Sequence, residues 1–276
     1  MDIGTAKIKK EQMQGVTHYM IDEWNPDEEF NVMIFQKHVK EIMEDIYNRG
    51  KIPILVGGTG FYIQAVLNDI AFTKEKQGDE IRADLQNLAK EKGASYLHHE
   101  LQKVDKESAE AIHPNNIKRV IRALEYFQST GQKFSDHNKE ERQKGSPYNF
   151  LYLVLTMNRK VLYERIDKRV DQMMEEGLVK EVKQLLDAGY SRNLVSMQGL
   201  GYKEIASALF KECTMEEAVY RLKRDTRHFA KRQMTWFRRE RDVTMINKDN
   251  FSNNHEIVNY IMKLAVEKGI CSCREG

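Results

Sequence analysis

A glycine-rich turn is the first feature of this sequence that could do chemistry. The turn Gly57-Gly58-Thr59-Gly60 follows an apolar run that begins at Ile52 and precedes a segment with helical character. Backbone amides and the dipole at the start of a helix favour an anion, and glycines let a ligand approach closely. The turn therefore suits a binding site, although tight packing alone also explains it. It is not a Walker A loop, because the only Gly-Lys pair, Gly50-Lys51, lacks the other required residues.

A polar helix start followed by basic residues is the second candidate. It begins at His113, where Pro114 and two asparagines favour the start of a helix. Lys118, Arg119 and Arg122 fall on the first turns, where three cations can clamp phosphate groups, although ordinary surface charge gives the same pattern. His113 is more readily a structural hydrogen-bond partner than a metal ligand, because no second His or Cys lies at ligand spacing.

The densest charge lies between Arg221 and Arg241, where nine basic and two acidic residues give a net charge of +7. The whole chain carries only +2, so the rest of it is acidic. A basic block on an acidic protein indicates a polyanion partner, nucleic acid or diphosphate, although a solvated helix face would look the same. At helical period the block separates into a basic stripe with Arg224, Arg227, Lys231 and Arg238 and an apolar stripe with Leu222, Phe229, Trp236 and Phe237.

The apolar stripe of this block is more readily core than a platform for stacking bases. Trp236 and Phe237, flanked by Arg238 and Arg239, would also suit single-stranded RNA. Other chemistries are excluded by the sequence. It has no G-x-S-x-G elbow, no C-x-x-C pair and no Asp-Asp pair of the kind that gathers Mg²⁺ in chain-elongating prenyl synthases. The Cys271-Ser-Cys273 tail lacks two further zinc ligands, so no metal site built from side chains is predicted.

The elements that must position these residues predict an α/β fold. The run from Ile52 reads as a buried strand that ends in the glycine turn, and Phe30 to Tyr47 reads as an amphipathic helix before it. Residues 75–145 are strongly charged and helical in pattern, which predicts a helical insertion. A second apolar strand, Phe150 to Thr156, returns the chain to a parallel sheet, and helices follow Asn158.

The length and composition fit this organisation. The chain has 276 residues, 41% hydrophobic and 31% charged, enough for one large domain or two modest ones. The longest uncharged stretch, 52–68, has 17 residues, short of the ~20 that a membrane-spanning helix needs. Three cysteines and the absence of a signal-like start predict a protein of the reducing cytoplasm that does not contact a membrane.

Together these segments resemble one family. The matching stretches are Met1-Asp-Ile-Gly-Thr-Ala-Lys7, His18 with Ile21-Asp22, Ile52 to Tyr62, Ile112 to Asn116, Arg119 to Glu125, Gly199-Leu-Gly-Tyr202 and Ala230-Lys-Arg-Gln-Met-Thr-Trp236. In order and spacing they resemble the tRNA dimethylallyltransferases, also called tRNA isopentenyltransferases. The resemblance implies transfer of a dimethylallyl group from dimethylallyl diphosphate to N6 of the adenosine on the 3′ side of the anticodon. The implied partners are the tRNA anticodon stem-loop and dimethylallyl diphosphate, with Mg²⁺ bound through the diphosphate.

The resemblance also implies a fold and a set of site residues. The fold is a P-loop-kinase-like parallel sheet core, residues 1–74 and 146–276 with helices at its C-terminal end, carrying a helical insertion, residues 75–145, that contacts tRNA. Thr59 and Arg227 would be catalytic, and Lys7, Arg227 and Lys231 would bind the diphosphate. The implied tRNA-binding residues are Thr59, Arg82, Lys118, Arg119, Val120, Ile121, Arg122, Gln198, Gly199, Leu200, Gly201, Tyr202, Lys203, Gln233, Met234, Thr235, Trp236, Phe237, Arg238 and Arg239.

The sequence departs from the family at its beginning. In the family a P-loop and a proton-accepting aspartate precede the motif that matches residues 1–7, and this chain contains neither. We therefore expect an N-terminally truncated chain, monomeric and inactive by itself. The alternatives are a tRNA-binding remnant without catalysis and, less well supported, a small-molecule kinase, which would leave the basic block without a role.

Overall fold

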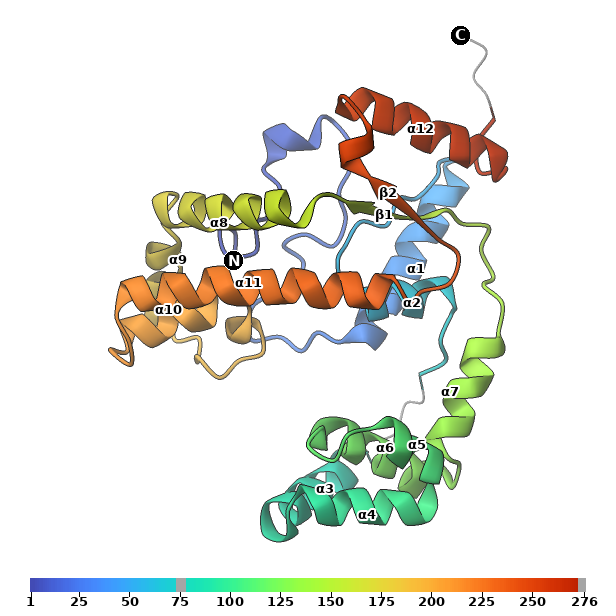
Figure 1. The fold of residues 1–276 in the computed structure, drawn as a ribbon, viewed down its shortest axis with the longest axis vertical. Helices are drawn as coiled ribbons and strands as arrows, with labels where there is room; N and C mark the ends of the chain where they lie inside the picture. The colour runs from blue at the N-terminus through green and yellow to red at the C-terminus, as the bar shows by residue number, and fades with distance from the viewer. Residues whose placement is uncertain (73–77, 273–276) are drawn as a thin grey trace. The chain divides into compact units, whose positions relative to one another are not determined.

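The computed structural model describes residues 1–72 and 78–272 and separates the chain into two compact units. Unit 1 comprises Met1–Ile63 and Asn149–Gly276, and unit 2 comprises Gln64–Tyr148. The units therefore begin and end elsewhere than the predicted ranges 1–74, 75–145 and 146–276. The assignment of 75–145 as an insertion that contacts tRNA stays a prediction. Figure 1 shows the elements of each unit.

Unit 1 is mostly helical. Its elements are η1 (Lys10–Met13), α1 (Val32–Asn48), β1 (Tyr152–Thr156), α8 (Arg159–Glu175), α9 (Leu178–Asp187), η2 (Ser196–Gln198), α10 (Tyr202–Leu209), α11 (Met215–Phe237), β2 (Val243–Asn247), η3 (Lys248–Asn250) and α12 (Asn254–Glu267), and α2 (Gly60–Leu67) begins in unit 1 and ends in unit 2. Side-chain caps begin several helices: Asn31 Oδ1 accepts hydrogen bonds from the amides of Met33 and Ile34, and Thr214 Oγ1 accepts one from the amide of Glu217.

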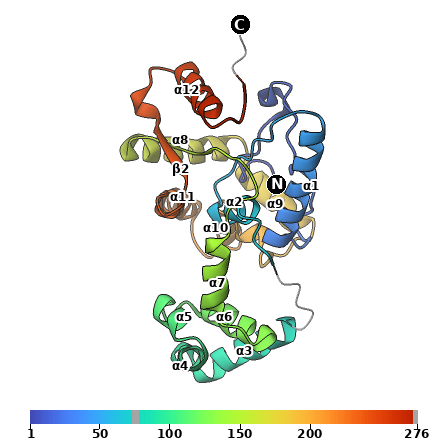
Figure 2. The ribbon, with the colours of Figure 1, turned by 90° about the vertical axis from the view of Figure 1, so that its right-hand side faces the viewer.

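The sheet of the described residues consists of two parallel strands. Tyr152 pairs with Val243 and Thr156 with Asn247, so β1 and β2 match along their full length. The pair lies between α11 and α12 (Figures 1 and 2). Tyr152 packs edge-on against Phe237 at the end of α11, with the ring centroids 6.3 Å apart. The predicted strand from Phe150 to Thr156 is thereby confirmed.

The other predicted strand, from Ile52 to the glycine turn, is wrong as a structural assignment. Residues 51–57 carry no strand hydrogen bonding, and the described sheet contains β1 and β2 alone. Ile54 and Val56 are 83% and 87% exposed, so the run is not buried either. Apolar, β-branched composition favours an extended backbone, but a strand also needs a neighbour that satisfies its amides and carbonyls. Here no described segment takes that place, and the run forms no regular secondary structure.

The core of unit 1 forms where α8 to α11 meet. Leu178 and Val182 of α9, Met197 of η2, Ile205 of α10 and Leu222 of α11 are all buried in one cluster. Of the apolar stripe predicted for the basic block, Leu222 packs into this cluster and is 2% exposed. Phe237 packs against Tyr152, and Phe229 is 39% exposed. In the basic stripe, Arg227 pairs with Asp167 of α8, and Arg224, Lys231 and Arg238 are exposed.

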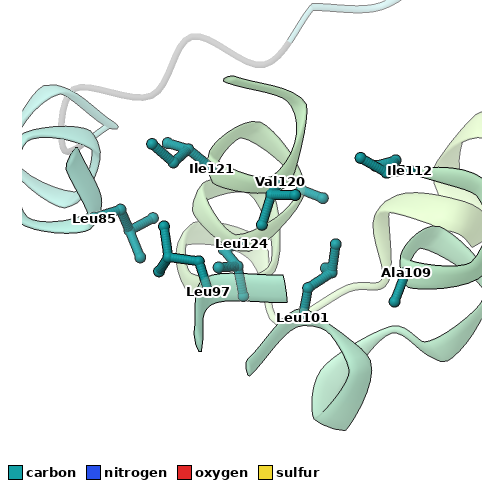
Figure 3. Close-up of a cluster of buried hydrophobic side chains, with 9 residues drawn as sticks. Leu85, Leu97, Leu101, Ala109, Ile112, Val120, Ile121 and Leu124 are labelled. Carbon is teal, nitrogen blue, oxygen red and sulfur yellow. The ribbon is translucent and has the colours of Figure 1, made fainter. Parts of the chain in front are cut away.

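The described part of unit 2 is helical, as its charged, strand-poor composition predicts. Its helices are α3 (Gly78–Lys92), α4 (Ala94–Val104), α5 (Lys106–Ala111), α6 (Ile117–Thr130) and α7 (Phe134–Gln143). Their core joins Leu85, Leu97, Leu101, Val120 and Leu124, whose side chains point toward one another in Figure 3. Gly131 ends α6 in the left-handed conformation, with φ of 70°, which glycine adopts without strain.

One buried acid ties three parts of unit 2 together. Asp105 caps α5 by accepting hydrogen bonds from the amide and hydroxyl of Ser108, at 3.0 and 2.6 Å. It also accepts from the amide and hydroxyl of Ser135 in α7, at 2.8 and 2.7 Å. Burial by itself raises the pKa of Asp105, but these four hydrogen bonds outweigh it and the pKa is lowered.

Candidate active site and family

Thr59 lies at the exposed tip of the glycine turn and starts α2. Its carbonyl oxygen accepts hydrogen bonds from the amides of Tyr62 and Ile63, at 3.0 and 3.2 Å. The Thr59 residue is exposed, whereas Gly60, the first residue of α2, is buried. The predicted turn into a helix is confirmed, and the side chain of Thr59 is available to a ligand.

Helix α11 holds the glycine turn in place. Gln233 Nε2 donates a hydrogen bond to the carbonyl oxygen of Gly58 at 2.9 Å. The indole of Trp236 lies so close to Gly60 that a Cβ at that residue would stand 2.1 Å from both Cδ1 and Nε1. Trp236 Nε1 is buried without a hydrogen-bond partner among the described residues. Gln233 and Trp236, predicted as tRNA contacts, are thus also the residues that fix the turn carrying Thr59.

Arg227 is held by α8. Its guanidinium Nη1 donates to Asp167 Oδ1 at 2.5 Å. One helical turn earlier on α11, Lys223 Nζ pairs with Asp171 Oδ1 at 2.6 Å. Lys231, one turn later, is exposed and makes no ion pair within the described ranges. Of the basic residues predicted to bind diphosphate, Lys231 is therefore the one with a free charge, and Arg227 has one donor engaged.

Lys7 bridges two carboxylates. Its Nζ lies 2.6 Å from Asp2 Oδ1 and 2.8 Å from Asp22 Oδ2. The hydrogen bonds that Lys7 donates to Asp2 and Asp22 raise the pKa of Lys7, and the one to Asp2 is the main cause of the lowered pKa of Asp2. The charge of Lys7 is thus compensated within this segment, and its role toward a diphosphate stays a prediction.

Glu181 of α9 fastens the segment that carries Lys7. Its carboxylate accepts hydrogen bonds from the amides of Asp2, Ile3 and Gly4 at 2.7, 2.8 and 3.2 Å, and from the hydroxyl of Tyr202 at 2.5 Å. Burial opposes ionisation of Glu181, but these bonds lower its pKa, and burial together with Glu181 raises the pKa of Tyr202. A Cβ on Gly4 would lie 2.5 Å from the Tyr202 ring, so this close approach requires glycine.

The Gly199-Leu-Gly-Tyr202 loop lies beside the same contact, because Tyr202 donates to Glu181. Gly201 has φ of 93°, which favours glycine, and its amide donates to Glu204 Oε2 at 2.8 Å. Gln198 Nε2 donates to the carbonyl of Arg192 at 2.7 Å. Leu200 packs against the core of unit 1, and Lys203 lies 3.4 Å from Glu204. The loop is thus held by hydrogen bonds and packing within unit 1, and its contact with tRNA stays a prediction.

Four residues predicted to contact tRNA have buried side chains. Val120, Ile121, Tyr202 and Phe237 are 0%, 5%, 2% and 7% exposed. They lie within basic segments, but Val120 and Ile121 pack into the core of unit 2, Tyr202 into the core of unit 1, and Phe237 against Tyr152. In this structure these side chains do not face solvent, so their assignment to tRNA binding rests on backbone contact and stays a prediction.

The remaining predicted contacts lie at the surface of their own units. Lys118 and Arg119 are exposed on α6, and Thr235, Arg238 and Arg239 are exposed at the end of α11, with Met234 half-buried. Arg82 donates to the buried Glu125 through Nε and Nη2, at 3.2 and 2.8 Å, and Arg122 Nη1 lies 3.3 Å from the same carboxylate.

Sequence reasoning missed the acids that hold the basic residues. Glu125 stands three residues after Arg122, a helical spacing that could have revealed it. Asp167 and Glu181 lie 60 and 178 residues from Arg227 and Ile3, so no local pattern pointed to them.

The structure offers neither a protein metal cage nor a membrane helix in the parts it describes. No group of three or more His, Cys, Asp or Glu side chains among those residues could hold a metal ion. No helix of residues 1–72 and 78–272 is both long and apolar enough to cross a membrane.

A family model described as IPP transferase matches residues 1–240 of this chain. This chain belongs to the IPP transferase family. Among the relatives of this family member, the tRNA dimethylallyltransferase of Lachnoclostridium phytofermentans is 57% identical over 270 residues, which cover 98% of this chain and 86% of that protein. The tRNA dimethylallyltransferase of Acetivibrio thermocellus is 48% identical over 258 residues, covering 94% and 82%. The family resemblance drawn from the motifs is thereby confirmed.

Solved structures of the family are similar as well. The tRNA isopentenylpyrophosphate transferase of Bacillus halodurans is 43% identical, with a TM-score of 0.69 over 98% of this chain and 85% of that one. A eukaryotic dimethylallyltransferase acting on tRNA has a TM-score of 0.80 at 27% identity, over 96% of this chain and 69% of that one.

Proposed function

We propose that this protein transfers a dimethylallyl group from dimethylallyl diphosphate to N6 of the adenosine on the 3′ side of the anticodon in tRNA. Membership of the IPP transferase family supports the reaction, and relatives named tRNA dimethylallyltransferase support the substrates. The observation that carries the assignment to particular residues is the attachment of the Thr59 turn to α11, the helix that also bears Arg227 and Lys231.

The residue types suit this reaction. The lone pair of N6 forms a bond to the first carbon of the allyl group, the bond from that carbon to oxygen breaks, and its electrons leave with the diphosphate. One N6 proton passes to a base. Arg227 and Lys231, and Lys7 with less support, would stabilise charge on the departing diphosphate. Thr59, exposed at the tip of its turn, would donate or accept a hydrogen bond at the target adenine.

Magnesium fits this arrangement as a companion of the diphosphate. Mg²⁺ commonly keeps several waters and binds through phosphate oxygens rather than through a cage of side chains. The basic character of α11 suits a diphosphate, which would itself supply ligands to the ion. When bound, the ion would withdraw charge from the leaving group, while Arg227 and Lys231 bind and orient it.

Binding of tRNA would use the exposed cations of both units. Lys118 and Arg119 on α6, with Arg82 and Arg122 beside them, form one group in unit 2, and Arg238 and Arg239 end α11 in unit 1. Contacts with phosphates are steeply salt-dependent and would supply the energy, about a few kcal/mol, needed to extrude the target base. A P-loop-kinase-like core is also proposed, supported by the parallel β1–β2 pair and the glycine turn that leads into α2.

The direct test is incubation of the protein with dimethylallyl diphosphate, Mg²⁺ and an anticodon stem-loop RNA, with mass spectrometry of the RNA. The expectation of inactivity rests on the absent P-loop segment alone, whereas relatives named tRNA dimethylallyltransferase match 94% and 98% of this chain. We therefore expect the mass of one dimethylallyl group to be added, and no addition when the target adenosine is replaced by guanosine. Arg227→Ala should abolish transfer, whereas Arg224→Ala, which removes a cation paired with Asp225 on the same helix, should not. RNA binding without any transfer would contradict the proposal and favour a tRNA-binding protein without catalysis.

A further inference from the structure

Two ion pairs join α8 to α11 one helical turn apart. Arg227 pairs with Asp167 and Lys223 pairs with Asp171, so an acid on α8 meets a cation on α11 at two successive turns. The helices lie next to each other and run in opposite directions (Figure 1). The same spacing would bring Tyr163 opposite Lys231, and that position holds no carboxylate. The acids of α8 therefore compensate Lys223 and Arg227 of α11, and Lys231 has no ion-pair partner among the described residues.

The two pairs match in their cations but not in their acids. The side chains of Arg227 and Lys223 are 25% and 24% exposed, whereas those of Asp167 and Asp171 are 38% and 55% exposed, and both pairs use a single short contact. They differ in distance from the turn that carries Thr59. Arg227 precedes Gln233, which holds that turn, by six residues, or about 9 Å along the helix, whereas Lys223 precedes it by ten residues, or about 15 Å.

The two cations also differ in what they can still bind. A guanidinium has five N–H donors in a planar fork, and Asp167 accepts from one of them. No other acceptor contacts Arg227 within the described ranges, so further donors stay available to an oxyanion. A carboxylate on one edge of the fork fixes the direction of the other edge, which matters for a ligand that is bound bidentately.

We propose that Asp167 is a positioning residue that fixes the guanidinium of Arg227 for the diphosphate of the prenyl donor, whereas Asp171 only joins the two helices. The inference rests on the proposed function, which makes Arg227 a ligand of the diphosphate. Asp167 acts through Arg227 and touches neither substrate. A competing account makes Asp167 a brake, because its negative charge neutralises Arg227 and would weaken anion binding.

The test measures binding of inorganic pyrophosphate, with Mg²⁺, to four variants of the full protein by titration calorimetry. These are Asp167→Ala, Asp167→Asn and the matched controls Asp171→Ala and Asp171→Asn. We expect Asp167→Ala to weaken binding about tenfold, the scale of one lost charge-assisted contact. Asp167→Asn keeps an acceptor oxygen and should recover most of this loss. Both Asp171 variants should stay within about twofold of the wild type, since an exposed ion pair contributes little.

Activity assays provide the second readout. Asp167→Ala should raise KM for dimethylallyl diphosphate and leave KM for the RNA unchanged, and the thermal midpoints of the two alanine variants should be equal. Tighter pyrophosphate binding by both Asp167 variants would overturn the proposal in favour of the brake, and equal weakening by the Asp167 and Asp171 variants would show a merely structural role. If Arg227→Ala itself leaves pyrophosphate binding unchanged, the proposed role of Arg227 fails first.

Discussion

Replacing Gly60 by alanine should test whether the position of the glycine turn against α11 matters for stability and activity. An added Cβ would lie 2.1 Å from Trp236 Cδ1 and Nε1, whereas carbon atoms in contact stay about 3.5–4.0 Å apart. The turn or the indole must therefore move by about 1.5 Å. The φ of Gly60 is not in the left-handed region, so the effect is purely steric.

The size of the effect follows from this displacement. Overpacking of this kind costs about 1–3 kcal/mol of the free energy of unfolding. A misplacement of about 1 Å at a reacting group costs about 100-fold in rate, so kcat/KM for RNA prenylation should fall by that factor. The two tryptophans, Trp24 and Trp236, both lie in unit 1, so tryptophan fluorescence in urea reports its unfolding.

A matched control lies in the same turn. A Cβ at Gly57 would have no neighbour within 4 Å, so Gly57→Ala should change the free energy of unfolding by less than about 1 kcal/mol and preserve activity. In a Trp236→Ala background the clash is absent, and the stability cost of Gly60→Ala should disappear. If Gly60→Ala matches Gly57→Ala in stability and in kcat/KM, the reasoning about this contact is refuted.

Two further predictions concern unit 2. Asp105→Asn should remove about 2 kcal/mol from its free energy of unfolding near neutral pH, measured by circular dichroism in urea. Because the pKa of Asp105 is lowered by folding from an ordinary value of 3.8, its contribution is present above that value and is lost as the pH falls through the lower, folded-state pKa. The wild type and the variant should therefore converge in acid, and a constant difference down to pH 2 would contradict this. Lys118→Glu should weaken binding of the anticodon stem-loop at low salt without changing stability, whereas Arg122→Glu should weaken both, because it sets a carboxylate beside the buried Glu125. Equal thermal midpoints of these two variants would show that the Arg122 pair contributes nothing.

Local patterns predicted most helices but not their long-range partners. The apolar spacing from Phe30 to Tyr47 predicted a helix, and α1 spans Val32–Asn48. The run from Phe150 predicted a strand, and β1 spans Tyr152–Thr156. The run from Ile52 has the same composition but lacks a described neighbour to pair with, which no local pattern can reveal.

In the candidate site, too, local features could be predicted from the sequence and long-range contacts could not. Motif types and spacing pointed to Thr59 and to the basic stripe of α11, because the glycine turn and the charge block are local features. The family resemblance implied that Gln233 and Trp236 contact RNA, whereas their contacts with Gly58 and Gly60 depend on packing between distant segments. The acids of α8 that pair with Lys223 and Arg227, and Glu181 of α9 that binds the amides of residues 2–4, needed the structure, since residue type alone does not identify a distant partner.

The hydrogen bonds that Glu181 accepts from the amides of residues 2–4 determine when this segment can fold during synthesis. The amide of Asp2 and its acceptor are separated by 179 residues. A ribosome makes about 5–20 residues per second, so residues 2–4 are synthesised well before Glu181 of α9. The segment with Lys7 therefore lacks its hydrogen-bond acceptor until the ribosome has synthesised Glu181, well past the middle of the chain. Its amide protons should become protected from exchange with solvent only when α9 and Tyr202 have emerged, although this segment is synthesised well before them.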